Sequence, residues 1–282
     1  MRIHSSRRYF ERYPGGGYLI RDDLLYQEDV RRFIVEMEFI RTDRFSSVET
    51  TNLRHRMHAV RLSDALPVLI QKAAWINPAY PVLRRINLRL TWMFKNYSLL
   101  AYEAALRLRE AGIPAVEVVA TWTHRPRRGP RENYLLYERV AAVGTLKQEL
   151  LRLTGPAHAR RRRALLEDTA RLARRIHNAG FRHGDLSICN VLVCQPGADE
   201  PLRVLDAGRL RHARIQWRPW KTLFDLREFR RLRLAGVDEY RLFLRAYFGG
   251  GECRGWFRIM RFWQWRGSQP LRAVRHVLVN AR

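Results

Sequence analysis

The first half of the chain contains short apolar runs separated by turn residues, a pattern typical of strands. Five runs predict strands, at Phe33–Val35, Met57–Val60, Leu66–Ile70, Val116–Ala120 and Tyr134–Tyr137. The last two flank a basic loop that contains proline and glycine, so we expect them to form a hairpin.

Further along the chain, apolar residues recur at helical spacing. Residues 96–111 show this spacing and stop before Gly112, a residue type that commonly follows a helix. Residues 164–179 have the clearest amphipathic pattern, and helical segments return from about residue 223. A strand-rich first half followed by a helix-rich second half predicts an α+β fold with two lobes around a cleft.

The predicted lobes divide the chain into three parts. Residues 1–30 contain the flexible run Pro14–Gly17 and are expected to form an N-terminal extension. Residues 31–141 then form a strand-rich N-lobe, and residues 142–282 form a helical C-lobe.

The charge of the chain is its most unusual compositional property. The net charge is +26 at pH 7, and only four of the basic residues are lysines. Such a field attracts phosphate-rich partners, which include nucleic acid, anionic lipid and phosphorylated glycolipid. No nucleic-acid-binding motif accompanies the charge, so a nucleic-acid partner is not expected.

Cysteine usage and hydropathy bear on cellular location. The cysteines, Cys189, Cys194 and Cys253, match no zinc-site spacing, and their odd number does not suit a disulfide framework. The polar start predicts no secretory signal, and no run approaches the roughly 18 apolar residues of a membrane-spanning helix. We therefore expect a cytoplasmic protein whose contact with any membrane is peripheral.

The stretch from His183 to Asn190 carries the candidate chemistry. Asp185 is followed by Asn190 five residues later, and Asp206 ends a short apolar strand sixteen residues after Asn190. Protein-kinase-like phosphotransferases use this order. In those enzymes the first aspartate accepts the proton of the attacking hydroxyl, and the asparagine and second aspartate hold Mg²⁺. The spacing predicts a two-lobed protein-kinase-like fold with Asp185 as catalytic base and with Asn190 and Asp206 as metal ligands.

A lysine and a glutamate in the N-lobe are candidates for binding ATP. Lys72 lies just beyond the predicted strand Leu66–Ile70, where it would reach the nucleotide phosphates. Glu103, on the predicted helix 96–111, would pair with Lys72. Glu110 is the alternative partner, although a negative charge is disfavoured so near a helix C-terminus.

The connection between the lobes is a candidate adenine site. Tyr137–Val140 has the form of a hinge, where the backbone C=O of Glu138 and the N–H of Val140 would hold the base. No Gly-x-Gly-x-x-Gly motif precedes Lys72, so the segment Arg44–Thr51, rich in serine and threonine, is the candidate for the loop that covers the phosphates.

Other polar residues near the motif have structural and functional interpretations. We expect His183 to brace the catalytic loop and His177 to end the helix before it. The run Arg160–Arg163 is either a solvated helix start or a contact to an anionic substrate or membrane.

Taken together, these motifs resemble the lipopolysaccharide core kinase family, bacterial enzymes that phosphorylate heptose or Kdo sugars. The resemblance covers roughly residues 66–232 and rests on Lys72, Tyr102–Glu103, Leu108–Pro114, Ile176–Asn190, Asp206 and Trp217–Leu226. It implies ATP and Mg²⁺ as cofactors, the lipopolysaccharide core glycolipid as acceptor, and peripheral work on the anionic inner face of the inner membrane. It also implies that Asp225 is a structural aspartate that braces the catalytic loop.

Three features differ from regulated protein kinases, and one of them is that no Ala-Pro-Glu sequence follows Asp206. Gly184 stands where regulated protein kinases commonly have an arginine that responds to phosphorylation of the activation loop. Ala207 stands where those kinases usually have a phenylalanine. The basic segment after Gly208 suits a phosphorylated saccharide; its arginines are Arg209, Arg211, Arg214 and Arg218. The alternatives are a phosphotransferase for another acceptor, either a small molecule or a protein, a non-catalytic pseudokinase, and a basic nucleic-acid-binding protein.

Overall fold

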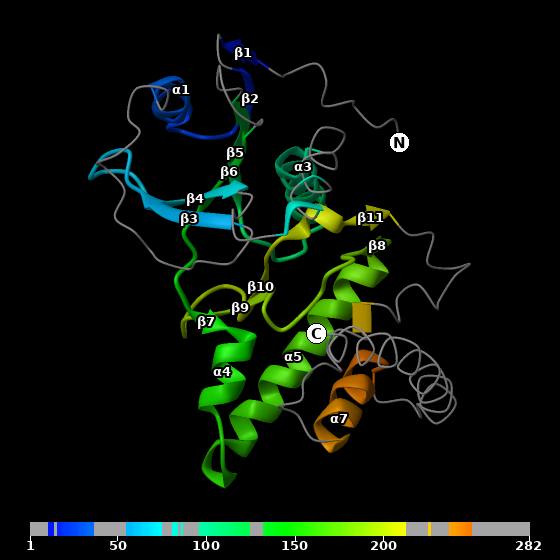
Figure 1. Ribbon diagram of the computed structural model, residues 1–282. Helices are drawn as coiled ribbons and strands as arrows, with labels where there is room; N and C mark the ends of the chain where they lie inside the picture. The colour runs from blue at the N-terminus through cyan, green and yellow to red at the C-terminus, as the bar shows by residue number, and fades with distance from the viewer. Residues whose placement is uncertain are drawn as a thin grey trace.

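The protein folds into two lobes joined by a narrow connection, as the ribbon of a computed structural model shows (Figure 1). The structure describes residues 11–13, 16–36, 55–74, 81–83, 86, 96–124, 132–212, 225–226 and 237–249. The candidate covering loop Arg44–Thr51 lies outside these residues, as do Arg214, Arg218 and Cys253.

The N-lobe is built on one antiparallel sheet of six strands in the order β1-β2-β5-β6-β4-β3. Its elements are β1 (Glu11–Tyr13), β2 (Gly16–Ile20), α1 (Gln27–Glu36), β3 (His55–Val60), β4 (Leu69–Ala74), α3 (Tyr97–Glu110), β5 (Val118–His124) and β6 (Glu132–Glu138). Strands β5 and β6 pair antiparallel, which confirms the predicted hairpin. Strand β3 includes the run predicted at Met57–Val60, whereas β4 begins three residues later than the strand predicted at Leu66–Ile70 and continues to Ala74, so it includes Lys72.

Two predictions for the start of the chain were wrong. Strand β2 pairs with β5 along its whole length, so residues 16–20 belong to the N-lobe sheet and not to a separate extension. The predicted strand Phe33–Val35 lies inside helix α1, because Val30 and Ile34 stand four residues apart and bury one helical face.

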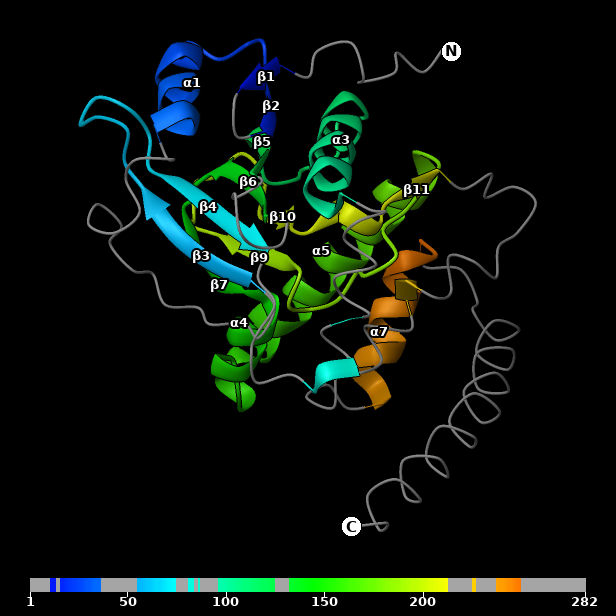
Figure 2. The same cartoon turned by 45° about the horizontal axis from the view of Figure 1, so that its top comes forward.

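Helices cover both faces of the N-lobe sheet (Figure 2). On one face, Val30 and Ile34 of α1 pack in a cluster with Trp122 and Leu136. On the other face, Ala101 and Ala105 of α3 pack in a cluster with Leu135 and its neighbours. Leu135 and Leu136 are adjacent in β6 and therefore point to opposite faces of the sheet. Strand β6 thus packs against the α1 cluster on one face and the α3 cluster on the other.

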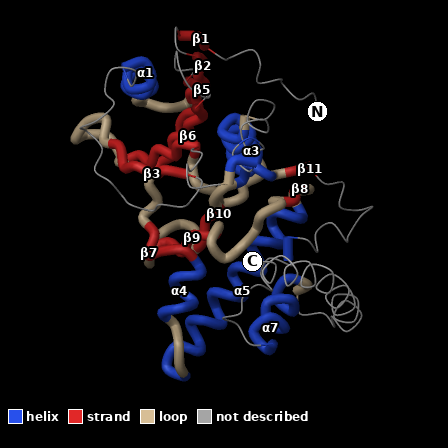
Figure 3. The backbone as a smooth tube through the Cα atoms, in the orientation of Figure 1, coloured by secondary structure: helices blue, strands red, loops and turns tan. Residues whose placement is uncertain are grey.

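The C-lobe is mostly helical, with short strands on the side that faces the N-lobe (Figure 3). Its elements are β7 (Ala142–Thr145), α4 (Leu146–Arg152), a 3₁₀ turn (Pro156–His158), α5 (Ala159–Asn178), β8 (Phe181–Arg182), β9 (Val191–Cys194), β10 (Leu202–Val204), a second 3₁₀ turn (Ala207–Arg209), β11 (Arg211–His212) and α7 (Val237–Tyr247). Helix α5 confirms the amphipathic helix predicted at 164–179 and begins five residues earlier. Its four predicted core residues, Leu165, Leu166, Leu172 and Ile176, are buried.

The lobes are also joined by backbone contacts near the cleft. The segment before β5 lies beside β10, where the Val116 N–H donates to the Val204 C=O (3.0 Å) and the Val204 N–H donates to the Pro114 C=O (2.9 Å). Helix α3 of the N-lobe packs on the turn Ala207–Arg209 of the C-lobe, and Gly208 lies against Ala101. The residues that follow β10 are therefore held from both lobes.

Candidate active site

The catalytic loop is fixed at its start by a buried carboxylate. Asp225, 1% exposed, accepts hydrogen bonds from the backbone N–H groups of His183 (2.6 Å) and Gly184 (2.8 Å). Its Oδ2 also lies 3.3 Å from His177 Nε2. Asp225 thus braces the loop, as the resemblance implied, and His177 lies in the last turn of α5 as predicted.

His183 connects the catalytic loop to the strand that leads to Asp206. Its Nε2 lies 3.1 Å from the Leu205 C=O, so in the neutral ring this nitrogen carries the hydrogen and donates it. Burial lowers the pKa of His183 below its ordinary value, against the opposing influence of Asp225 and Asp206. Within the described residues, Nδ1 is buried without a hydrogen-bond partner, so a second proton would have no acceptor there. His183 therefore braces the loop as a neutral ring.

The three residues of the predicted motif are gathered by short backbone contacts. Asn190 Nδ2 donates to the backbone C=O of Asp185 (2.8 Å), which sets the turn between the two residues. The Leu205 N–H donates to the Asn190 C=O (2.9 Å), which places Asn190 next to the residue before Asp206. The Asp185 side chain is 38% exposed, so its carboxylate is open to an acceptor.

Lys72 of the N-lobe forms an ion pair with Asp206 of the C-lobe. Lys72 lies within β4, and its Nζ is 3.1 Å from Asp206 Oδ2. Asp206 has a left-handed backbone (φ 54°, ψ 50°), a conformation that aspartate tolerates better than most residues. This turn at the end of β10 is what directs its carboxylate toward the N-lobe.

The structure does not form the predicted ion pair between Lys72 and Glu103. Lys72 pairs with Asp206 instead, and Glu103 Oε2 lies 3.8 Å from Arg107 Nη2, one turn along α3. The role of Glu103 in binding the nucleotide remains a prediction.

Gly184 is required by its surroundings. Its φ is +79°, and a Cβ at this position would lie 2.8 Å from the backbone oxygen of Arg209. The residue after His183 therefore has room for no side chain, which explains why an arginine is absent there. The turn Ala207–Arg209 places a positive charge near the base instead, because Arg209 Nη1 lies 3.7 Å from Asp185 Oδ2.

Replacing Gly184 with alanine tests this close approach. We expect Gly184→Ala to be less stable and to lose phosphate transfer, because the new methyl group pushes the catalytic loop away from Arg209. Gly197→Ala is the matched control: its φ is +90°, but no atom lies within 4 Å of the added Cβ. The control should lose only the backbone cost of about 1–2 kcal/mol and keep its transfer rate. Equal losses in denaturant unfolding and in rate would contradict the role given to Gly184.

The hinge region is anchored from the N-terminal segment. The Glu138 side chain accepts a hydrogen bond from Tyr26 Oη (3.1 Å), and Arg21 bridges Glu138 (3.3 Å) and Glu117 (2.7 Å). The Glu138 side chain is therefore engaged with residues 21–26. Its backbone role, and that of Val140, remain predictions. The sequence gave no indication that Arg21 contacts the hinge, because Glu117 and Glu138 lie about a hundred residues away from it.

The donor set fits a magnesium ion held together with phosphates. Asp206 offers a carboxylate, and Asn190 uses its Nδ2 on the Asp185 carbonyl, which leaves its side-chain oxygen for a cation. Within the described residues there is no cluster of three His, Cys, Asp or Glu that would hold a metal by itself. This agrees with the habit of Mg²⁺ of binding one or two carboxylates plus substrate phosphates.

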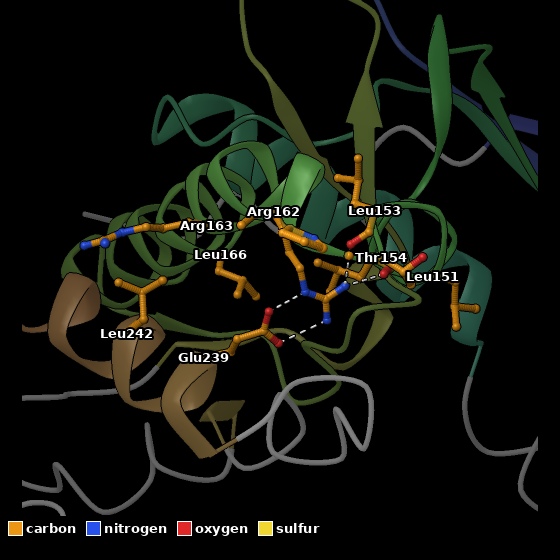
Figure 4. A pocket seen from close by; sticks show the side chains of 12 residues that line it. Leu151, Leu153, Thr154, Arg162, Arg163, Leu166, Glu239 and Leu242 are labelled. Atoms are coloured by element: carbon orange, nitrogen blue, oxygen red, sulfur yellow. Dashed lines mark hydrogen bonds and ion pairs between the residues drawn. The ribbon is translucent and has the colours of Figure 1, made fainter.

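A separate hollow of about 610 Å³ lies at the far end of α5 (Figure 4). Its wall includes Arg162, which makes a paired contact with Glu239 of α7 and also donates to the Leu150 C=O. About 15 residues of helix, or roughly 22 Å, separate this hollow from the catalytic loop. Arg162 is thus structural, while Arg160 and Arg161 in the same run are exposed.

A six-stranded sheet lobe, a helical lobe and the contacts that link Lys72 with Asp206 and Asp185 with Asn190 define the protein-kinase-like class. A solved structure described as WaaP in complex with acyl carrier protein has this fold: it matches with a TM-score of 0.59 and 20% identity, over 90% of this chain and 98% of that chain. The model of the Lipopolysaccharide kinase (Kdo/WaaP) family matches residues 85–247. The chain belongs to this family. No curated protein matches it in sequence.

Family membership confirms the resemblance drawn from the motifs and makes the protein a kinase of lipopolysaccharide synthesis that uses ATP. The matched residues include Asp185, Asn190, Asp206 and Glu103, whereas Lys72 precedes them. Among the described residues, no helix combines the length and the apolarity that crossing a bilayer requires.

Proposed function

We propose that this protein transfers the γ-phosphate of ATP to a hydroxyl of a heptose or Kdo sugar in the lipopolysaccharide core, with Asp185 as the base. The observation that carries the proposal is the connected set of contacts in the cleft. Lys72 pairs with Asp206, Asn190 holds the Asp185 carbonyl, and Leu205 ties Asn190 to the Asp206 strand. Such positioning is what phosphoryl transfer needs, since its catalysis is mostly orientation and charge neutralisation.

In the proposed reaction, the acceptor hydroxyl lies beside the exposed Asp185 carboxylate. Its oxygen forms a bond to the γ-phosphorus as its proton passes to Asp185. The bond from the γ-phosphorus to the bridging oxygen breaks, and ADP leaves with the electron pair. Lys72 binds the nucleotide phosphates, and the backbone of Glu138 and Val140 holds adenine.

Asn190 and Asp206 are the proposed magnesium ligands. When bound, Mg²⁺ would neutralise charge on the phosphates. Asp206 also holds Lys72 close, so one carboxylate orients both cations of the site. Glu103, on the helix that packs against the turn after Asp206, is proposed to support this arrangement from the N-lobe.

We place the enzyme peripherally on the anionic inner face of the inner membrane, where the core glycolipid is assembled. The net charge of +26 supports this placement, because basic residues near an anionic bilayer are each worth about 1 kcal/mol. Arg160 and Arg161 are exposed at the start of α5 and are available for such a contact.

The test is mass spectrometry of the lipopolysaccharide core from cells that lack the gene, complemented with wild type or with Asp206→Ala. We expect the core to lose one phosphate without the gene and to regain it only with the wild-type copy. The position of that phosphate identifies the sugar. A core of unchanged mass would reject the core sugar as acceptor.

A further inference from the structure

Two arginines face each other at the start of the catalytic loop. Strands β8 and β11 pair antiparallel with Arg182 directly opposite Arg211. Residues opposite each other in such a pair point to the same face, with Cβ atoms about 4.5–5.5 Å apart. Arg182 is immediately followed by His183, Gly184 and Asp185, so the pair adjoins the proposed base.

Without a bound ligand, this pair of arginines destabilises the fold. Like charges directly opposite each other destabilise a strand pair. Within the described residues, Arg182 Nε is buried without a hydrogen-bond partner. The nearby acids are already engaged: Asp225 accepts the loop N–H groups, and Asp206 pairs with Lys72.

A third guanidinium group belongs to the same region. Arg209 lies two residues before Arg211, and its Nη1 is 3.7 Å from Asp185 Oδ2. Its side chain is 57% exposed, so the group is open to a ligand as well as to Asp185. We call Arg182, Arg209 and Arg211 the arginine cluster. Within the described residues, Asp185 is the acid seen to pair with this cluster, through Arg209.

We propose that the arginine cluster binds an anionic substituent, a phosphate or a carboxylate, of the acceptor sugar and so positions the neighbouring hydroxyl at Asp185. This inference rests on the proposed function and narrows its substrate to acidic sugars. Guanidinium groups suit the ligand, because their planar fork binds phosphate and carboxylate oxygens in pairs. A bound anion would also offset the repulsion between Arg182 and Arg211.

The test compares Arg182→Gln and Arg211→Gln with Arg171→Gln, a control on α5 whose arginine pairs with Asp168. Initial rates are measured with the purified full chain, ATP and three acceptors: intact core glycolipid, enzymatically dephosphorylated core, and core with reduced carboxyl groups. We expect each cluster variant to raise the KM for intact core about 10- to 100-fold, while the KM for ATP stays the same.

The modified acceptors identify the anion. Removing the group that the cluster binds should raise the wild-type KM to that of the variants and leave the variants' own KM unchanged. The dephosphorylated and carboxyl-reduced cores thus distinguish phosphate from carboxylate. Equal KM values for wild type and variants on intact core would overturn the proposal, as would a wild type indifferent to both modifications.

Two further measurements distinguish anion binding by the arginine cluster from a structural role and from failure of the proposed function. The cluster variants should melt at the wild-type temperature or above it, because the substitution removes repulsion; a lower melting temperature would indicate a structural role instead. Calorimetric titration with inorganic phosphate should show binding to wild type and to Arg171→Gln but not to the cluster variants. If no core is phosphorylated by the wild type, the proposed function fails, and the titration alone decides whether the cluster is an anion site.

Discussion

Asp185→Asn is expected to lower the rate of phosphate transfer by about 10²- to 10⁴-fold, the usual contribution of a positioned general base. Asparagine keeps the size of the side chain but cannot accept the proton of the acceptor hydroxyl. The loop should stay in place, because the contacts that hold it use the Asp185 backbone C=O and the N–H groups of His183 and Gly184. We therefore expect the loss in kcat, with KM values for ATP and acceptor close to wild type.

The measurement is the steady-state rate of ADP release with purified enzyme and core glycolipid. Asp168→Asn is the matched control, since Asp168 is also partly exposed but lies on α5, paired with Arg171 at 2.5 Å. The control should retain the wild-type rate. Undiminished transfer by Asp185→Asn would remove Asp185 as the base.

Asp225→Ala is expected to destabilise the fold by about 2–6 kcal/mol, because it leaves two buried N–H groups without acceptors at about 1–3 kcal/mol each. The same carboxylate lies beside His177, so the end of α5 also loses a contact. Activity should fall with stability, because His183 and Gly184 are the residues that lead into Asp185. Urea unfolding monitored by tryptophan fluorescence measures the first effect.

An exposed aspartate provides the comparison for Asp225. Asp199 lies exposed in the turn between β9 and β10, and Asp199→Ala should change stability by less than about 0.5 kcal/mol. Asp225→Asn should fall between the two, since its amide oxygen can accept from the loop while its NH₂ group cannot. If Asp225→Ala were no less stable than Asp199→Ala, the anchoring role of the buried carboxylate would be refuted.

Local patterns predicted α3, α5 and the hairpin β5–β6 correctly, because their signals were contained within each element. Asn96 caps α3 by accepting from the Leu99 N–H, and the apolar residues of α5 recur at helical spacing. Helix α1 was misread as a strand because its run of three consecutive apolar residues, Phe33–Val35, is too short to show a period. Strand β2 was missed because residues 14–17 were interpreted as a flexible run, whereas β2 pairs with β1 across that turn and with β5 about a hundred residues away.

In the site, too, features set by neighbouring residues were predictable, whereas contacts between distant segments were not. The order of Asp185, Asn190 and Asp206 was sufficient to predict the class of chemistry, and the family match confirms that class. The pairing of Lys72 with Asp206 depends on the left-handed backbone of Asp206, which the sequence does not display. The facing of Arg182 and Arg211 depends on strand register, which residue spacing alone does not set.

The position of β2 has a consequence for synthesis on the ribosome. Residues 16–20 emerge about a hundred residues before the end of their partner strand β5, which ends at His124. At about 5–20 residues per second, the first strand waits roughly 5–20 s before β5 has been made. During this interval an apolar strand is exposed in the nascent chain. We therefore expect nascent chains that stall before residue 124 to bind chaperones, and chains released after it to complete the sheet.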